Sequence, residues 1–238
     1  MTELIFEYDR LLIHSEYRTP EVHSHLASHL IIALGGSLKC EIGGDVSETA
    51  GVCIASDVPH TVYAETGDML LYLFDTTSFL SDSLNERYLH NERFCTLDSV
   101  LVDELRGIWK NNDPGAADRK MLERCGLLHD RSSCRDERIT AVLDYLQNTQ
   151  TVSDDIMERL CGTACLSQSR LSHLFREQVG ISLHRYLALD KMKKGYIYYR
   201  KYGNITDAAM RAGFDSPSHF AATCKRMFGI SFSEIMKS

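Results

Sequence analysis

Histidines cluster in one short stretch of this sequence. The segment "VHSHLASH" carries His23, His25 and His29, and His60 follows in "DVPH". Imidazole nitrogens bind Zn, Fe, Ni or Cu, act as catalytic bases, or form hydrogen bonds in a polar pocket. The first three histidines are odd-numbered, so one continuous strand would direct all of their side chains to the same face. The stretch therefore offers three imidazoles for a metal site, for catalysis or for a polar pocket.

The segments around these histidines have the pattern of short β-strands. Branched residues and Gly-Gly turns recur in "HLIIALGGSLKCEIGG", "ETAGVCIASDVPHTVYAE" and "DMLLYLFD". This pattern predicts the hairpins of a small barrel over about 15–80. Several large apolar residues are expected either to line a pocket beside the histidines or to form plain core. They are Leu30, Ile32, Tyr63, Tyr72 and Phe74.

Residues 81–130 are predicted to be helical. Apolar residues at helical spacing run through "LNERYLHNERF" and "SVLVDELRGIWK", stop at "NNDPGAAD", and resume in "RKMLERCGLLHD". The second of these segments has an amphipathic stripe, which usually packs against its own domain. Residues 131–137 are predicted to be a linker.

The second half of the chain contains a duplicated unit. "SQSRLSHLFREQVGIS", 167–182, and "SPSHFAATCKRMFGIS", 216–231, align without a gap at an offset of 49 residues. Each copy begins with a serine suited to a helix N-cap and has a glycine where the helix should end. A short helix precedes each copy, capped by Ser153 in the first and by Asn204 in the second. Short helix, tight turn and second helix form the helix-turn-helix pattern.

Between the two copies, "LHRYLALDKMKKGYIYYRKYG" predicts a connecting helix. About 17 residues of helix would span about 26 Å. A rigid helix of that size would hold two recognition helices roughly one DNA turn, about 34 Å, apart.

Charge separates the two halves of the chain. The net charge is −7, but residues 136–238 carry 14 Lys and Arg against 11 Asp and Glu, whereas residues 1–135 carry 12 against 22. Many of the basic residues belong to or flank the duplicated helices, where DNA phosphates would lie. They favour a nucleic-acid partner over a helical module that binds other proteins.

These motifs resemble those of the AraC/XylS transcription regulators over about 139–236. "NITDAAMRAGFDSPSHFAATCKRMFGIS" is similar to the C-terminal signature of that family. The resemblance implies a seven-helix domain whose two helix-turn-helix units read successive major grooves of promoter DNA. Cys161 and Cys165 depart from the family pattern in the first unit, and Gly195 replaces an alanine of the linker helix.

The same resemblance assigns DNA contacts by position. The residues it places on DNA are Gln168, Ser169, Arg170, Ser172, His173 and Arg176 in the first unit, and Ser218, His219, Ala222, Lys225 and Arg226 in the second. Gln and His read base edges, whereas Ser discriminates weakly and Ala contacts only a thymine methyl. The first unit is therefore expected to carry more sequence information, and the second to contact mainly phosphate.

The N-terminal half resembles the cupin-like sensor domain common in front of this DNA-binding domain. His-x-His, a residue four places later and a distant histidine match the cupin metal pattern, with His29 where many metal cupins have Glu and His60 as the distant ligand. Three interpretations stay open. The barrel binds Zn, Fe, Ni or Cu; it binds a small organic effector through the same histidines; or it serves only dimerisation.

The expected fold is a two-domain α+β chain. A cupin-like sensing and dimerisation domain spans 1–130, and a double helix-turn-helix domain spans 138–238. The expected function is that of a cytoplasmic, homodimeric, DNA-binding regulator. By resemblance it is an activator that contacts RNA polymerase. It has no membrane partner and no catalytic residue.

Two other functions remain alternatives. One is a metal-dependent cupin enzyme fused to a DNA-binding domain, and the other is a metal- or redox-sensing regulator that uses the histidines or cysteines. The eight cysteines form no CxxC pair, which indicates reduced thiols. The start "MTELIFEYDR" has no signal-peptide pattern, and no apolar run approaches the roughly 18 residues of a membrane span.

Overall fold

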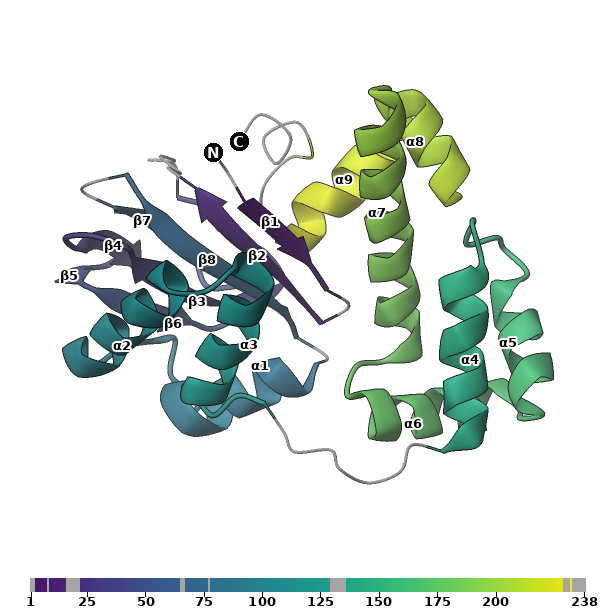
Figure 1. The fold of residues 1–238 in the computed structure, drawn as a ribbon, viewed down its shortest axis with the longest axis horizontal. Helices are drawn as coiled ribbons and strands as arrows, with labels where there is room; N and C mark the ends of the chain where they lie inside the picture. The colour runs from purple at the N-terminus through teal and green to yellow at the C-terminus, as the bar shows by residue number, and fades with distance from the viewer. Residues whose placement is uncertain are drawn as a thin grey trace. The chain divides into compact units, whose positions relative to one another are not determined.

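The computed structural model describes residues 3–7, 9–15, 22–64, 67–76, 78–128, 136–228 and 232. The chain divides into two compact units, Met1–His129 with Cys224–Ser238, and Asp130–Thr223 (Figure 1). The predicted combination of a β-rich N-terminal part and a helical C-terminal part is confirmed. The exact domain limits at 1–130 and 138–238 stay predictions, and most of the predicted linker, 131–135, lies outside the described residues.

Two antiparallel sheets form the core of the first unit. The larger has the strand order β1-β2-β8-β3-β6-β9, and the smaller has the order β5-β4-β7. The strands of the larger sheet are β1 (Glu3–Phe6), β2 (Arg10–Ser15), β8 (Met69–Asp75), β3 (Ala27–Ala33), β6 (Gly51–Ile54) and β9 (Phe94–Thr96). Those of the smaller sheet are β5 (Asp45–Thr49), β4 (Leu38–Ile42) and β7 (His60–Ala64).

The predicted single barrel is wrong in one respect. Among the described strands the hydrogen-bonded ladder does not close, because β1 and β9 are the two edges of one sheet and β5 and β7 are the two edges of the other. The burial pattern fits two layers. Leu38, Cys40 and Ile42 alternate with exposed residues along β4, whereas every residue of β3 and β8 is buried. A strand buried throughout must be covered on both faces.

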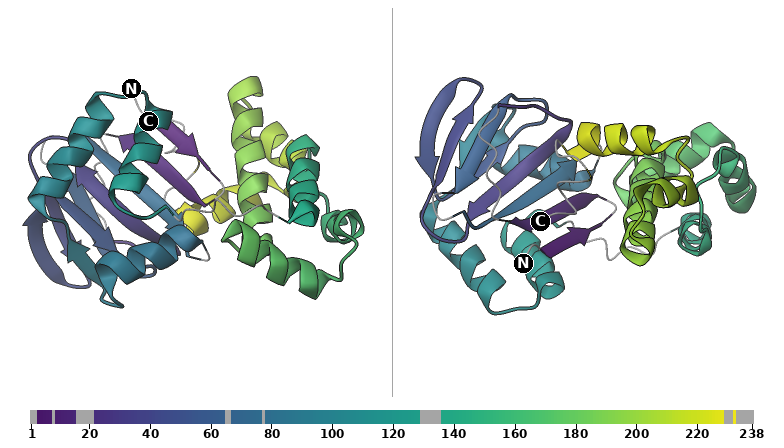
Figure 2. Two further views of the ribbon diagram at one scale, coloured as in Figure 1. Left: turned by 60° about the horizontal axis from the view of Figure 1, so that its bottom comes forward. Right: turned by 90° about the horizontal axis from the view of Figure 1, so that it is seen from above.

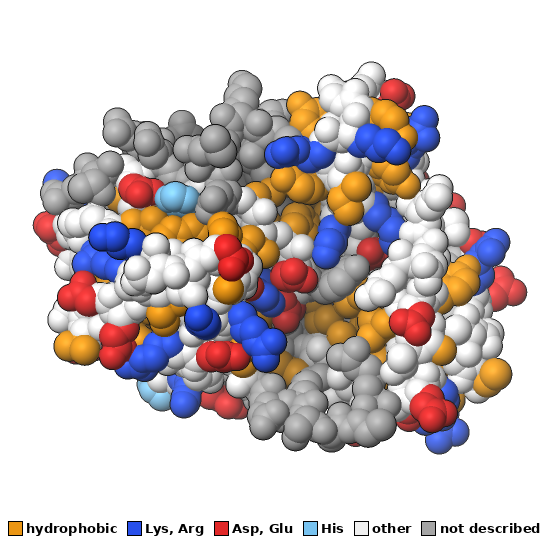
Figure 3. Space-filling view, in the orientation of Figure 1, with side chains coloured by type: hydrophobic (Ala, Val, Ile, Leu, Met, Phe, Trp, Pro, Cys, Tyr) orange, Lys and Arg blue, Asp and Glu red, His pale blue; other side chains and the backbone are white. Residues whose placement is uncertain are grey.

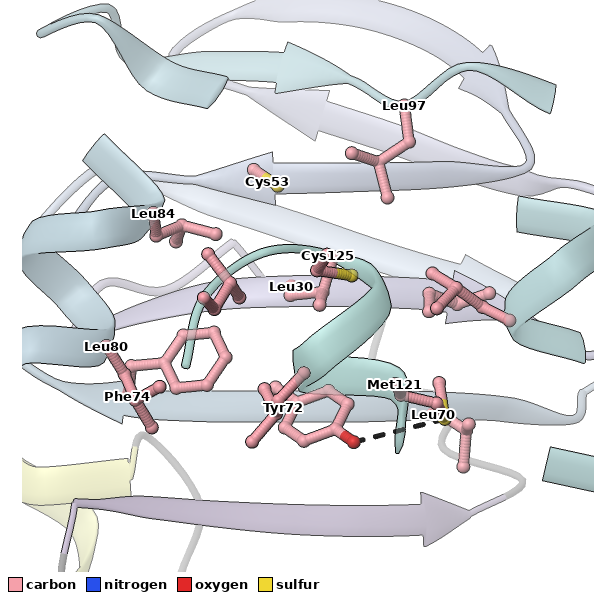
Figure 4. Close-up of a cluster of buried hydrophobic side chains, with 14 of the residues drawn as sticks. Leu30, Cys53, Leu70, Tyr72, Phe74, Leu80, Leu84, Leu97, Met121 and Cys125 are labelled. Carbon is pink, nitrogen blue, oxygen red and sulfur yellow. Dashed lines mark hydrogen bonds between the residues drawn. The ribbon is translucent and has the colours of Figure 1, made fainter. Parts of the chain in front are cut away.

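Helices cover one face of the larger sheet (Figure 2). They are α1 (Phe79–Leu84), the π-helical turn η1 (Asn85–Leu89), α2 (Ser99–Lys110) and α3 (Pro114–Arg124). Strand side chains such as Leu30 and Tyr72 meet Leu84, Met121 and Cys125 in one buried cluster (Figure 4). This cluster is the main apolar core of the first unit.

An ion pair links α3 to the sheet beneath it. Arg10 of β2 contacts Asp118 of α3 through Nε at 3.1 Å and through Nη2 at 2.5 Å. The side chains are only 15% and 5% exposed. A buried ion pair of this kind holds two elements in one relative position, because separating its charges leaves one of them without a partner.

Two of the three segments predicted for this region differ from the sequence prediction. The helix expected over "LNERYLHNERF" ends early, since η1 stops at Leu89 and Phe94 begins strand β9. The expected break "NNDPGAAD" contains the start of α3, where Asp113 is the N-cap and Pro114 occupies the first turn. Proline suits that position because its missing N–H would have no partner there. The helix expected over "SVLVDELRGIWK" is confirmed as α2.

The second unit is helical, as the repeat predicted. It contains α4 (Glu137–Asn148), α5 (Ile156–Ala164), α6 (Gln168–Val179), α7 (Leu183–Tyr202) and α8 (Ile205–Ala212), and α9 (Pro217–Phe228) begins in it. Helices α5 and α6 form the first helix-turn-helix unit, and α8 and α9 form the second. The linker helix α7 is 20 residues long, or about 30 Å, and is slightly longer than predicted.

The caps of these helices agree in part with the prediction. The Asn204 carboxamide oxygen accepts hydrogen bonds from the backbone N–H groups of Thr206 and Asp207, as expected. The predicted cap Ser153 is wrong, because α5 begins after Asp155. The Ser153 hydroxyl instead donates to the Asp155 carboxylate at 2.5 Å.

Close packing explains the glycine in the linker helix. A Cβ added to Gly195 would lie 2.7 Å from the ring of Phe220, the first large apolar residue of the α9 core face. Gly195 is thus the place where α9 approaches the linker helix. Among the described residues, no helix combines the length and apolar character required to span a bilayer.

Candidate functional site

The four predicted histidines come together in the structure. His29 lies on β3 and His60 begins β7, so they belong to the two different sheets. His23 pairs with His60 in an isolated bridge, with backbone N···O distances of 3.0 and 2.9 Å. His25 follows within the same segment and is buried. The cluster therefore fills the space between the two sheets.

The route by which these histidines converge is not the predicted one. One continuous strand was to carry His23, His25 and His29, but the chain bends at Leu26 and β3 starts only at Ala27. The bend brings His25 back over His29, and the two Nε2 atoms are 3.0 Å apart. The common face predicted from residue parity is thus reached through a bend.

Ring geometry defines a tight group, which we call the histidine cluster: His23, His25, His29 and His60. The centroid of the His60 ring lies 4.7 Å from that of His23, 5.5 Å from that of His25 and 4.5 Å from that of His29. His23, His25 and His60 each offer one nitrogen, and these three atoms lie within 4.8 Å of one another. Three imidazoles at that separation suit a transition metal.

Burial keeps three of these imidazoles, His25, His29 and His60, neutral. It lowers the pKa of His25 to about 3 and that of His60 to about 4, and it holds the pKa of His29 well below the ordinary value. The neighbouring histidines add to the effect on His25 and His29, because two positive rings side by side repel each other. A neutral imidazole keeps the lone pair that a metal or a hydrogen-bond donor requires.

A backbone contact orients one ring of the cluster. Nδ1 of His60 donates to the carbonyl oxygen of Val58 at 2.7 Å. The proton of neutral His60 is therefore on Nδ1, and Nε2 carries the free lone pair. Metal-binding histidines are commonly fixed in this way by a second hydrogen bond.

The stability of the first unit is expected to fall as the pH drops from 6.5 towards 4. In the unfolded chain His25 and His60 titrate near 6.5, whereas in the fold they stay neutral down to about 3 and 4. His29 also stays neutral in the fold, so the unfolded state binds three more protons over this range and stability falls by up to about 4 kcal/mol per pH unit. Above pH 6.5 both states are neutral and the effect is absent.

Urea unfolding followed by Trp109 fluorescence measures this effect, because Trp109 is the only tryptophan and lies on α2 of the first unit. A His25→Gln, His60→Gln variant serves as the control. In this variant, most of the pH dependence of the free energy of unfolding below pH 6.5 is expected to disappear. Equal slopes for the two proteins between pH 6.5 and 4.5 would show that the cluster is not buried as neutral imidazoles.

Most of the apolar residues expected beside the histidines belong to the other side of the sheet. Leu30 and Ile32 alternate with His29 along β3, so their side chains lie on the face covered by helices. Tyr72 and Phe74 join the same helix-covered core, with ring centroids 5.5 Å apart. Tyr63 is 40% exposed. The pocket-lining interpretation of these residues is therefore wrong, and plain core is correct for the four buried ones.

The cysteines fall into two groups. Cys40 and Cys53 are buried, and burial raises the pKa of both thiols, which makes them less reactive. Cys161 is half-buried, and Cys165 is exposed with a backbone φ of 51° at the end of α5. A cysteine thus takes the left-handed position at the end of α5, where glycine is the residue with least strain.

The residues predicted to contact DNA share one structural property: they lie at the surface of the two recognition helices. Those of the first unit are on α6, and those of the second are on α9. Ten of them are exposed and Ser172 is half-buried; the exposed ones are Gln168, Ser169, Arg170, His173, Arg176, Ser218, His219, Ala222, Lys225 and Arg226. Their role in binding stays a prediction.

The opposite faces of these helices are packed. Leu171 and Phe175 are the buried residues of α6, and Phe220 is fully buried on α9. This division leaves a polar face on each recognition helix. Basic residues also end the neighbouring helices, with Arg200 and Lys201 in the last turn of α7 and Arg211 in that of α8. Figure 3 shows Lys and Arg side chains over α7 and α8.

One contact at this surface was missed by sequence reasoning. Nδ1 of His219 lies 2.9 Å from Oδ2 of Asp215, one helical turn earlier. The four-residue spacing of an acid and a histidine was a signal for such a pair.

Comparisons with known proteins agree with this description. Residues 160–238 match the family model described as Helix-turn-helix domain, HTH_18. The chain is 24% identical over 228 residues to the probable transcriptional regulator LumQ of Photobacterium leiognathi, covering 88% of this chain and 89% of that protein. It is 29% identical over 100 residues to the arabinose operon regulatory protein of Escherichia coli, covering 42% of this chain and only 34% of that protein.

Among solved structures, an apo ToxT variant from Vibrio cholerae has a similar fold. The TM-score is 0.52 at 12% sequence identity, and the match covers 98% of both chains. The resemblance read from the duplicated motif is confirmed: residues 160–238 match a helix-turn-helix domain, and the chain is similar to transcription regulators that include the arabinose operon regulatory protein.

Proposed function

We propose that this protein regulates transcription by binding promoter DNA through both helix-turn-helix units, under the control of a signal held in its first unit. The duplicated pair of recognition helices supports this function most directly. Each has a buried apolar face and an exposed face with polar or basic side chains. Side chains of that kind reach base edges and phosphates when a recognition helix lies in the major groove.

The protein acts as a cytoplasmic homodimer that activates transcription and contacts RNA polymerase. The signal binds one arrangement of the dimer more tightly than another and so shifts the population between them. Because two linked DNA domains bind more tightly than one, the arrangement determines which pairs of sites are occupied. It is a regulator without catalytic residues, in keeping with the named functions of its relatives.

The histidine cluster is the site of the signal, and its chemistry favours a divalent transition metal such as Zn, Fe, Ni or Cu. His23, His25 and His60 would hold the ion, with His29 beside them as a fourth imidazole. When bound, the ion would supply coordinate bonds between the segment that carries His23 and His25 and strand β7. Of the residues of the chain, His25 and His60 supply buried, neutral imidazoles, and the tautomer of His60 is fixed by Val58. A small organic effector bound by the same histidines is the alternative.

Selection of duplexes from a random-sequence pool tests the DNA-binding function. The protein is expected to enrich a sequence with two half-sites about one helical turn apart, and affinity for it is expected to fall steeply with salt as phosphate contacts release counterions. An Arg170→Ala, Arg176→Ala variant should bind the selected duplex at least about 10-fold more weakly. Failure to enrich any sequence would contradict the proposed function.

Metal content measured by mass spectrometry on tag-free protein tests the signal. After incubation with Zn, Fe, Ni or Cu and removal of free ion, we expect about one ion per chain in the wild type. A His25→Ala, His60→Ala variant should lose it, because two of three converging ligands are gone. The control is His184→Ala, an exposed histidine of α7. No retained metal in the wild type would instead direct the search to an organic effector.

A further inference from the structure

The start of the second recognition helix holds one histidine in a defined orientation. His219 is in the first turn of α9, and its backbone N–H donates to the Ser216 hydroxyl at 3.1 Å. Its ring lies edge-on to Phe214, with centroids 5.6 Å apart. Its Nδ1 is 2.9 Å from the Asp215 carboxylate. The ring is thus fixed on one side while 48% of the side chain remains exposed.

The first helix-turn-helix unit has different residues at the positions that correspond to Asp215 and His219. With the offset of 49 residues, Arg170 corresponds to His219, and Leu166 corresponds to Asp215. Arg170 is exposed on α6 and carries donors only. Of the two units, only the second therefore has an acid and a histidine at these two positions, which gives it a different hydrogen-bonding group there.

A carboxylate beside Nδ1 decides where the ring carries its proton. Because an ionised carboxylate only accepts hydrogen bonds, Nδ1 of the neutral ring must be the donor, and Nε2 is left with its lone pair. Nε2 is then an acceptor. The donors that a major groove presents to it are the N6 amino group of adenine and the N4 amino group of cytosine.

We propose that Asp215 is a positioning residue that holds His219 in the Nδ1–H tautomer, so that Nε2 reads an amino group of adenine or cytosine in the second half-site. This inference rests on the proposed function, since it requires α9 to enter the major groove. The inference assigns base reading to the second helix-turn-helix unit, for which the sequence had predicted mainly phosphate contacts. Asp215 itself touches no base in this arrangement and acts only through the ring.

The tautomer can be measured without DNA. Long-range nitrogen–proton NMR spectra of the full-length protein, labelled with ¹⁵N at histidine and recorded above pH 8, separate the two neutral forms. We expect His219 in the Nδ1–H form in the wild type and mainly in the Nε2–H form, the one that free histidine prefers, in Asp215→Ala. A His219→Gln variant assigns the signal. The same form in both proteins, or Nε2–H in the wild type, would overturn the proposal.

A second pair serves as the matched control. His173 of α6 has its Nδ1 3.9 Å from the Glu177 carboxylate, which is too long for a hydrogen bond. Glu177→Ala is therefore expected to leave the His173 signal unchanged. An equally large tautomer change there would mean that any nearby acid has this effect, and the assignment to the Asp215 contact would be wrong.

Selection from random duplexes then tests base reading at pH 8. The wild type is expected to enrich adenine or cytosine at one position of the second half-site. Asp215→Ala should bind that duplex about 3–10-fold more weakly and relax the preference at that position alone, as expected for one lost hydrogen bond. Unchanged preference in a variant whose tautomer has changed would overturn base reading by His219. If the wild type enriches no sequence at all, the proposed function fails, whereas the tautomer measurement still stands.

Discussion

Gly213→Ala is expected to destabilise the helical unit by about 2–5 kcal/mol and to remove DNA binding by the second helix-turn-helix. Gly213 ends α8 with a φ of 96°, where a residue with a side chain is strained. An added Cβ would also lie 2.3 Å from the carbonyl oxygen of Val152, a backbone atom that cannot move alone. Strain and overpacking each contribute about 1–3 kcal/mol.

Thermal unfolding followed by circular dichroism at 222 nm, together with binding to a selected duplex, measures both effects. Gly203→Ala is the control for backbone strain. It has a φ of 69° and no heavy atom within 4 Å of its added Cβ, so only about 1–2 kcal/mol should be lost. Gly162→Ala on α5 also has open space and is expected to stabilise slightly. If Gly213→Ala and Gly203→Ala lower the stability of the helical unit by similar amounts, the contact with Val152 does not contribute to the effect of Gly213→Ala.

Asp118→Ala is expected to lower the free energy of unfolding of the first unit by about 3–5 kcal/mol. The variant leaves the guanidinium of Arg10 buried beneath α3 without its carboxylate partner. Removing one member of a buried pair usually has that effect, since the remaining charge stays out of water. Asp9, whose carboxylate lies 2.7 Å from Arg10 and is 37% exposed, is expected to compensate only in part.

A double variant tests whether the unpaired charge of Arg10 causes the loss of stability in Asp118→Ala. Arg10→Met, Asp118→Leu replaces both charges by apolar groups of similar length and should lose less stability than Asp118→Ala alone. Urea unfolding monitored by Trp109 reports on this unit. A loss below about 1 kcal/mol in Asp118→Ala would mean that the position of α3 does not depend on the ion pair.

The helical unit was predicted well because its signals are local. Asn204 before an apolar-periodic segment, and Gly180 and Gly213 at the ends of helices, specify where each helix begins or stops. The repeat then showed the same helix-turn-helix pattern a second time, 49 residues later in the chain. The sequence gives no such signal for tertiary contacts. The approach of Phe220 to Gly195 became visible only when two helices were packed together.

The β unit was predicted in outline, with errors where distant residues decide the structure. The convergence of His23, His25, His29 and His60 followed from their pattern, but the bend at Leu26 depends on pairing of His23 with β7. Strand β9 is three residues long and exists because β6 provides its partner. Short segments of that kind carry too little periodicity to be recognised from the sequence.

The pairing of His23 with His60 joins two points separated by 37 positions in the chain. Any bond across this junction, including one through an ion held by His25 and His60, closes a loop that the unfolded chain otherwise leaves open. Closing a loop of this length costs about 4 kcal/mol of chain entropy on folding, which bonds across the junction help to offset. Any ligand that binds the cluster in the folded unit and not in the unfolded chain would stabilise the first unit.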